Sequence, residues 1–140
     1  MRRWQASCSA LVIMPTPHQE RLGRLGEDLA CRELRRHGYA ILARRFRTRH
    51  GEIDIVARDG DVLVFVEVKA RTSRGFGGAL GALTRRKQRQ VVAMAQRYMA
   101  RVRWSARPCR FDVVAIQADS GHPPQVTVVR NAFGAGWPGR

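Results

Sequence analysis

The sequence predicts one α/β domain, a mixed β-sheet flanked by helices, and three observations favour this fold class. The 140 residues are enough for one domain with a buried core and too few for two. Apolar residues recur at helical spacing in two segments of the chain. Between and after these segments, β-rich runs are bounded by turn residues. The resulting order is helix, three strands, helix, two strands, which is typical of a sheet covered by helices.

The first helix is expected from Pro17 to about His37, and Gly38 supplies its end. Three leucines recur along it at helical spacing: Leu22, Leu25 and Leu29. Small residues form a strip that another element can approach closely: Gly23, Gly26 and Ala30. Residues 1–16 are interpreted as a loose N-terminal extension, so the single domain is expected to span residues 17–133.

The remaining elements follow in order. A short strand is predicted for residues 39–42, with a basic loop or strand continuation over 44–50. After a hairpin, the glycine-rich residues 70–83 are expected to form a loop. A second helix is expected from Thr84 to about Arg103, with an apolar face of Val91, Val92, Ala95, Tyr98, Met99 and Val102. Strands at 111–116 and 126–129 complete the sheet, and residues 134–140 are expected to be a flexible tail.

Residues 51–69 are predicted to form the hairpin, with its turn at Asp59-Gly60. Pairing outward from this turn places Glu52 opposite Glu67, and Asp54 lies diagonal to Glu67. Side chains alternate between the two faces of a strand. One face is then entirely apolar and is expected to be core: Ile53, Ile55, Ala57, Val62, Val64, Val66 and Val68.

The opposite face of the hairpin is mixed near the turn and acidic away from it, where Glu52, Asp54 and Glu67 gather beside Lys69. One explanation is a salt-bridged surface with Lys69 and the basic run 44–49 as counter-ions. The explanation that we favour is a site for a hard divalent cation, Mg²⁺ or Mn²⁺, which takes oxygen ligands and is often held by carboxylates. A metal explains why acids converge in a chain with 11 acidic and 26 basic residues.

The formal net charge of +15 predicts a polyanionic partner, and nucleic acid is the leading class. A coding bias towards Arg is the alternative, because all but two of the 26 basic residues are Arg. The two exceptions are Lys69 and Lys87. A Lys where Arg is the default suggests a position that needs a compact charge with an adjustable pKa.

Other classes of protein are disfavoured. No apolar run approaches the roughly 20 residues of a membrane helix, so no membrane partner is expected. Cys8, Cys31 and Cys109 are widely spaced and odd in number, which indicates neither a disulfide framework nor a zinc site. Such cysteine usage fits a reducing cytoplasm. Asp112 is expected to be a structural acid that anchors a neighbouring Arg.

The spacing of the acids forms a motif. Asp54, twelve further residues and then Glu67-Val68-Lys69 resemble the PD-(D/E)xK signature of restriction-endonuclease-like nucleases, with Ile53 where the signature has Pro. The resemblance implies a restriction-endonuclease-like mixed sheet flanked by helices. It also implies that Asp54 and Glu67 hold Mg²⁺ and that Lys69 assists the attacking water.

A second resemblance spans about residues 24–133. The chain is similar to the YraN family of small bacterial proteins, which are assigned the endonuclease-like fold and have no settled function. The similarity rests on residues 26–30, 38–42, 51–57, 64–69 and 110–114, with Arg71, Phe76-Gly77 and Lys87. That family usually has Asn near Arg45. In related nucleases a Glu of the first helix points at the metal, which implies this role for Glu27; an exposed Glu paired with a nearby Arg is the alternative.

The hypothesis is a Mg²⁺-dependent nuclease that hydrolyses DNA phosphodiesters, with branched or repair-related DNA as a candidate substrate. Asp54, Glu67 and Lys69 form the expected catalytic set, with Glu27 and Glu52 as further metal ligands. The expected phosphate contacts are Arg45, Arg47, Arg49, Arg71, Arg85, Arg86 and Lys87. The alternatives are a nucleic-acid-binding module of the same fold without turnover and a protein whose basic surface meets an acidic partner.

Overall fold

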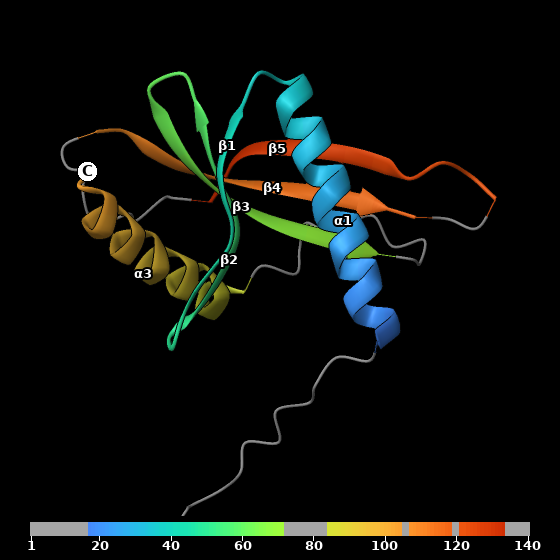
Figure 1. The fold of residues 1–140 in the computed structure, drawn as a ribbon, viewed down its shortest axis with the longest axis horizontal. Coiled ribbons are helices and arrows are strands. Elements are labelled where there is room, and N and C mark those ends of the chain that lie inside the picture. The colour runs from blue at the N-terminus through green and yellow to red at the C-terminus, as the bar shows by residue number, and fades with distance from the viewer. Residues whose placement is uncertain (1–16, 72–83, 105–106, 119–120, 134–140) are drawn as a thin grey trace, which may run out of the picture.

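A computed structural model of the chain describes residues 17–71, 84–104, 107–118 and 121–133 (Figure 1). The expected N-terminal extension, the glycine-rich residues 72–83 and the expected tail lie outside the described residues. So do the side chains of residues 17–22 and of Arg71. Neither helix in the described part of the chain has both the length and the apolar character needed to span a membrane.

The strands form one five-stranded sheet in the order β1-β2-β3-β4-β5. Neighbouring strands are antiparallel except β3 and β4, which are parallel and are joined through α3, as a parallel pair requires a crossover. The described elements are α1 (Pro17–Arg36), β1 (Ala40–Thr48), β2 (Gly51–Asp59), β3 (Val62–Arg71), α3 (Arg85–Val102), β4 (Cys109–Gln117) and β5 (Gln125–Phe133). The predicted order and the predicted α/β class with a mixed sheet are therefore confirmed.

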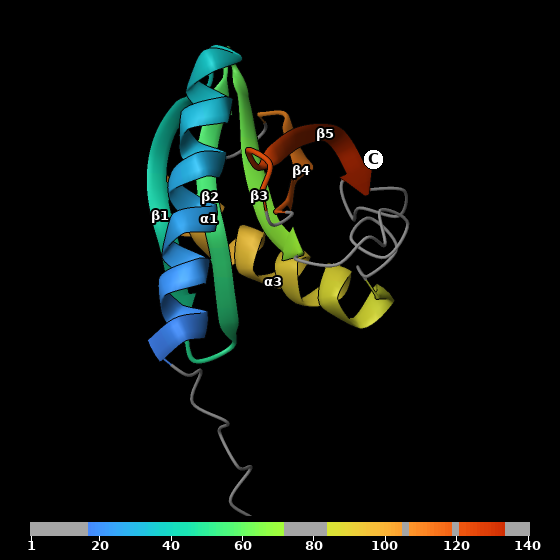
Figure 2. The same ribbon diagram turned by 90° about the vertical axis from the view of Figure 1, so that its right-hand side faces the viewer.

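The two helices cover opposite faces of the sheet, as the two views of Figures 1 and 2 show. Alternation along β2 and β3 supplies a core to each face. The core beneath α1 contains Ala30, Leu34, Ile55, Ala57, Val64, Val66, Val114 and Ile116. The core beneath α3 contains Ile53, Val56, Leu63, Phe65, Val91, Met94, Ala95 and Phe111. The face of the hairpin that was expected to be mixed near the turn is thus buried by α3.

The hairpin turns one residue later than predicted. Asp59 pairs with Val62, so the turn is Gly60-Asp61, and Gly60 has φ +60, the positive value that the first position of such a turn needs. Asp59 stays in the strand, where its carboxylate accepts a hydrogen bond of 2.8 Å from Arg110. The predicted register was wrong by two residues. The predicted faces largely survive, because a shift of two preserves the alternation of side chains.

Ile53 is the exception to the predicted faces, since it packs in the core beneath α3 and not with Ile55. The pairing of β2 with β3 ends at Ile55, and β2 continues towards Gly51 paired with β1 alone. There Ile53 pairs with Phe46 of β1, which packs against the same core beneath α3.

The helix faces differ from the predicted ones at single positions. Leu25 on α1 is 54% exposed. The small strip is correct at Ala30, which is buried, and at Gly26, where a Cβ would meet Ile116 and Ala70 at 3.6 and 3.7 Å. It is wrong at Gly23, which is exposed and where a Cβ would meet nothing within 4 Å. Thr84 caps α3 by accepting a hydrogen bond from the backbone N–H of Lys87. Met94 is buried on α3 although it was not predicted to be. Val102 lies in the last turn and is exposed.

Asp112 is a structural acid, as expected. It is fully buried on β4 and accepts hydrogen bonds from the hydroxyl of Tyr39 at 2.9 Å and from Arg110 at 3.0 Å. The backbone N–H of Asn131 on β5 donates to the same carboxylate. The network ties Tyr39, which lies between α1 and β1, to β4, β5 and the end of β2, since Arg110 also holds Asp59.

Candidate metal centre

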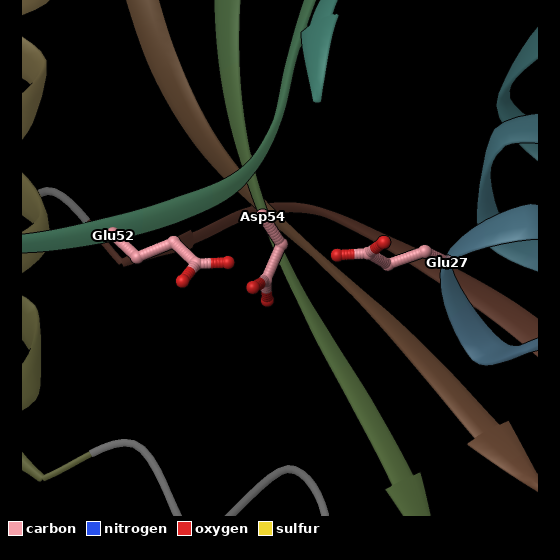
Figure 3. Close-up of side chains that lie close together, drawn as sticks. All are labelled: Glu27, Glu52 and Asp54. Atoms are coloured by element: carbon pink, nitrogen blue, oxygen red, sulfur yellow. The ribbon is translucent and has the colours of Figure 1, made fainter. Parts of the chain in front are cut away.

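Three carboxylates converge at one edge of the sheet. Glu27 comes from α1, and Glu52 and Asp54 come from the part of β2 that has left β3. One oxygen of each carboxylate lies within 4.8 Å of the others. Figure 3 shows the three side chains pointing towards one another from their two elements. They line a cavity of about 400 Å³, together with Arg45, Arg47 and residues of α1 and β3.

Local structure explains how the three acids meet. Gly26 lets α1 approach Ala70 and Ile116, which brings the adjacent Glu27, 7% exposed, over the sheet edge. Asp54 Oδ2 accepts a hydrogen bond of 2.8 Å from the backbone N–H of Val68, so a side chain replaces the strand pairing that stops at Ile55. The separation of β2 from β3 therefore creates the cavity and also orients its central carboxylate.

Glu27 is held by two arginines of β1. Arg45 Nε donates to both carboxylate oxygens at 2.8 and 2.9 Å, and Arg44 donates to one of them at 3.3 Å. Arg45 has φ +52, a left-handed conformation that a long side chain rarely adopts. Glu27 is thus paired with arginines, as the alternative interpretation expected, but it is buried and not exposed, and it lines the cavity.

Glu52 is paired in a similar way, since Arg47 Nε donates to it at 2.7 Å. In the predicted run 44–50, residues 44–48 continue the strand as part of β1, and residues 49–50 form the turn that follows it. Alternation along that strand, with the left-handed residue within it, places Arg45 and Arg47 at the cavity. Two of the three candidate ligands, Glu27 and Glu52, therefore already form an ion pair with an arginine of the chain.

The pKa of Asp54 is raised to about 7, first by burial and then by the negative charge of Glu67. Glu52 adds to the increase, while the hydrogen bond from Val68 and the charge of Lys87 oppose it. Asp54 also has no arginine ion pair among the described residues, unlike Glu27 and Glu52. A cation placed among these carboxylates would offset both the burial and the repulsion that raise this pKa.

Glu67 lies close enough to Asp54 to raise its pKa, but it belongs neither to the cluster nor to the cavity lining and faces two lysines. Its Oε1 is 3.5 Å from Lys69 Nζ and 3.4 Å from Lys87 Nζ. Its Oε2 is buried and has no hydrogen-bond partner among the described residues. The only two lysines of the chain thus meet on one oxygen. The rarity of lysine in this chain indicated a position that needs a compact charge. From the sequence, however, Lys87 was expected to bind phosphate, and its contact with Glu67 was not predicted.

The other predicted contact residues are spread around this region. Arg85 and Arg86 are exposed in the first turn of α3, and Arg49 is exposed beyond β1, where its Nε lies 3.3 Å from His50. The side chain of Arg71 lies outside the described residues. Arg24, which was not among the expected contacts, lines the cavity. Arg44, a member of the basic run expected to supply counter-ions, contacts Glu27.

The donor set fits a hard cation. All of the gathered ligand atoms are carboxylate oxygens, which suit Mg²⁺ or Mn²⁺ and not a soft metal. The buried and unpartnered Oε2 of Glu67 adds an acceptor whose hydrogen-bonding capacity is unused within the described structure. Glu27, Glu52 and Asp54 are the residues that could hold the ion directly, with Glu67 close to Asp54.

The fold and this cavity define a small α/β sheet domain with a partly buried acidic cluster at a sheet edge. Residues 26–116 match the uncharacterised protein family UPF0102. The chain is 50% identical over 116 residues to a UPF0102 protein of Geobacter metallireducens, covering 83% of this chain and 94% of that protein. It is 44% identical over 115 residues to a UPF0102 protein of Pseudomonas aeruginosa strain LESB58, covering 81% and 92%. The protein belongs to the UPF0102 family, which confirms the YraN-like resemblance.

Proposed function

We propose that this protein is a Mg²⁺-dependent nuclease that hydrolyses phosphodiester bonds of DNA, with branched or repair-related DNA as the expected substrate. The observation that carries the proposal is the convergence of Glu27, Glu52 and Asp54 within 4.8 Å in a cavity rimmed by arginines. Carboxylates alone would repel a phosphate. An acidic centre inside a chain of net charge +15 is therefore best explained by a cation that bridges acids and phosphate.

In this proposal each residue has a defined task. Asp54, Glu27 and Glu52 hold the ion, and Glu67 completes the acidic environment. A bound Mg²⁺ supplies Lewis-acid polarisation of a phosphoryl oxygen and lowers the pKa of a bound water. Lys69, 3.5 Å from Glu67, orients the attacking water or stabilises the negative charge that develops on the phosphate.

The arginines of β1 have two tasks. While no cation is bound, Arg45 and Arg47 neutralise Glu27 and Glu52. A cation that takes over those carboxylates leaves the two guanidinium groups at the cavity without their acids. Guanidinium groups suit bidentate contacts with phosphate, so the released side chains would bind the substrate backbone.

One observation favours a second function, a nucleic-acid-binding module without turnover. Glu27, Glu52 and Glu67 each have a basic partner within the chain. A site that is neutralised internally does not need a metal to be stable. In that case the acids would serve to position arginines and lysines for phosphate.

The test is a cleavage assay on single-stranded, duplex and branched DNA with Mg²⁺ or Mn²⁺, run beside binding of Mn²⁺ by calorimetry. Asp54→Asn removes the central ligand and keeps an acceptor for the Val68 N–H. We expect it to reduce cleavage about 100-fold or more and to abolish the binding of Mn²⁺. Asp61→Asn is the matched control, because Asp61 is an exposed acid in the hairpin turn.

Loss of cleavage in both variants, or in neither, would contradict the assignment of the site. Absence of cleavage on every substrate, with salt-sensitive DNA binding retained, would favour the binding module. Binding of Mn²⁺ that is unchanged in Asp54→Asn would remove the metal centre from the proposal.

A further inference from the structure

A second hollow lies further along α1, between this helix and β1. It has a volume of about 590 Å³ and is lined by Asp28, Cys31, Arg32, Arg35, Arg36 and Arg44. We call it the basic groove. The acidic cavity is bordered by residues 23–27 of α1 and the basic groove by residues 28–36, so the two are consecutive along one helix. Figure 2 shows α1 and β1 running side by side along this surface.

The positive charge of the basic groove is only partly neutralised. Its lining holds four arginines and one acid. Arg44 donates to Asp28 at 2.7 Å, and Arg36 contacts Glu33 at 3.2 Å. Arg32 and Arg35 are exposed and form no ion pair within the described part of the chain. The groove therefore presents at least two guanidinium groups to which no carboxylate is bound in the described structure.

Folding alone does not account for this arrangement. Arg32, Arg35 and Arg36 are spaced i, i+3 and i+4, which places them on one helical face, where like charges repel. The last turn of a helix favours basic residues, which accounts for Arg35 and Arg36. It does not account for Arg32 one turn earlier or for Arg44 on the neighbouring strand. An anion seated among the four would offset their repulsion.

We infer that the basic groove binds the phosphodiester backbone of nucleic acid, as a continuation of the path that leaves the acidic cavity. The identification of the bound anion as nucleic acid rests on the proposed function. Between Asp28 and Arg36 the helix rises about 12 Å, which corresponds to roughly three nucleotides of one strand. Arg44 stands at the junction, because its guanidinium contacts Glu27 of the cavity and Asp28 of the groove.

The contact chemistry is that of arginine with phosphate. Guanidinium groups bind phosphate oxygens in bidentate geometry and remain charged at any physiological pH. Contacts of this kind carry no base information, so the groove would set register and affinity and not sequence preference. Binding through it is expected to depend strongly on salt.

The experiment compares two triple variants with equal loss of charge. Arg32→Gln, Arg35→Gln and Arg36→Gln remove the groove charges from α1. Arg97→Gln, Arg103→Gln and Arg107→Gln remove three exposed charges on or just after α3, which covers the other face of the sheet. Binding of a fluorescently labelled DNA duplex is measured by anisotropy from low to high salt in EDTA. Circular dichroism checks that both variants fold.

We expect the groove variant to bind DNA about tenfold more weakly or worse at low salt. The slope of log affinity against log salt should become shallower by about 2 to 3, as three phosphate contacts require. The control variant should change affinity less than threefold. Equal losses in the two variants would overturn the proposal and leave only a general effect of net charge.

A second arm distinguishes the anion. Vesicles containing phosphatidylserine replace the DNA, and a groove variant that loses vesicle binding while keeping DNA binding would overturn the proposal in favour of a membrane surface. The use of EDTA separates the groove from the metal centre. If the protein cleaves no DNA but the groove variant still binds DNA more weakly than the control variant, the proposed nuclease activity is refuted and the role of the basic groove stands.

Discussion

Lys87 Nζ on α3 lies 3.4 Å from Glu67 Oε1 on β3, two residues that the chain separates by a crossover. Lys69 approaches the same oxygen at 3.5 Å. Two ammonium groups thus share one oxygen of this buried carboxylate, and the other oxygen has no partner within the described structure. Glu67 is therefore positioned by charge and not by a full set of hydrogen bonds. The contact therefore couples α3 to the acidic region across the face of the sheet.

Replacing Lys87 by Met should lower the free energy of unfolding by about 1–2 kcal/mol, because Glu67 then remains buried with a single cation. Its side chain is about one third exposed, so solvent screens part of the effect. Urea denaturation measures the loss. In the double variant with Glu67→Gln the cost of Lys87→Met should shrink, and an unchanged cost would show that the two residues are not coupled.

Asp54 makes stability depend on pH. Its pKa is about 7 in the folded protein against an ordinary value of 3.8. The unfolded chain therefore releases this proton first as the pH rises, and stability falls between about pH 4 and pH 7. Asp54→Asn should stabilise the protein by on the order of 4 kcal/mol at pH 8 and by almost nothing at pH 4, because each unit of pKa shift corresponds to about 1.4 kcal/mol.

Urea denaturation in EDTA at several pH values measures this difference. Asp61→Asn, an exposed acid in the turn, should show no such pH dependence. A stabilisation by Asp54→Asn that is equal at pH 4 and pH 8 would rule out the raised pKa as its cause.

Arg45 is expected to compete with a metal ion for the carboxylate of Glu27, and a substitution can test this competition. Arg45→Asn removes the guanidinium from Glu27 and places at φ +52 a residue that tolerates the left-handed conformation. We expect the affinity for Mn²⁺ to rise several-fold, since the cation no longer displaces an internal charge. Calorimetry measures it, with Arg45→Gln as the variant that removes the charge and keeps the strain. Weaker binding of Mn²⁺ in both would show that Arg45 supports the site.

Asp112 should behave as a residue of the core and not of the site. Asp112→Ala leaves Arg110 and the Tyr39 hydroxyl without their buried acceptor and should cost about 3–5 kcal/mol of unfolding free energy. Thermal or urea denaturation gives the cost. Binding of Mn²⁺ by the folded fraction should be unchanged, and a selective loss of Mn²⁺ binding at native stability would contradict the structural role.

The sequence could predict elements whose signals are local. Helical spacing located α1 and α3, and alternation assigned the faces of β2 and β3 from Ile55 to Val68. Burial was harder to predict, since the hairpin face with Val56, Leu63 and Phe65 is covered by a helix that comes later in the chain. The register failed for a similar reason, because Asp59 is kept in its strand by the distant Arg110.

By itself, the sequence determined the fold class, the order of the elements and the hairpin acids of the candidate site, because periodicity and motif spacing are properties of short segments. The family and the candidate role of Glu27 came from a resemblance that spans most of the chain. Only the tertiary structure decided which acids meet. It placed Glu27, Glu52 and Asp54 together and turned Glu67 towards Lys69 and Lys87. The reason is physical: the end of the β2–β3 pairing at Ile55 and the close approach of α1 at Gly26 depend on contacts between remote residues.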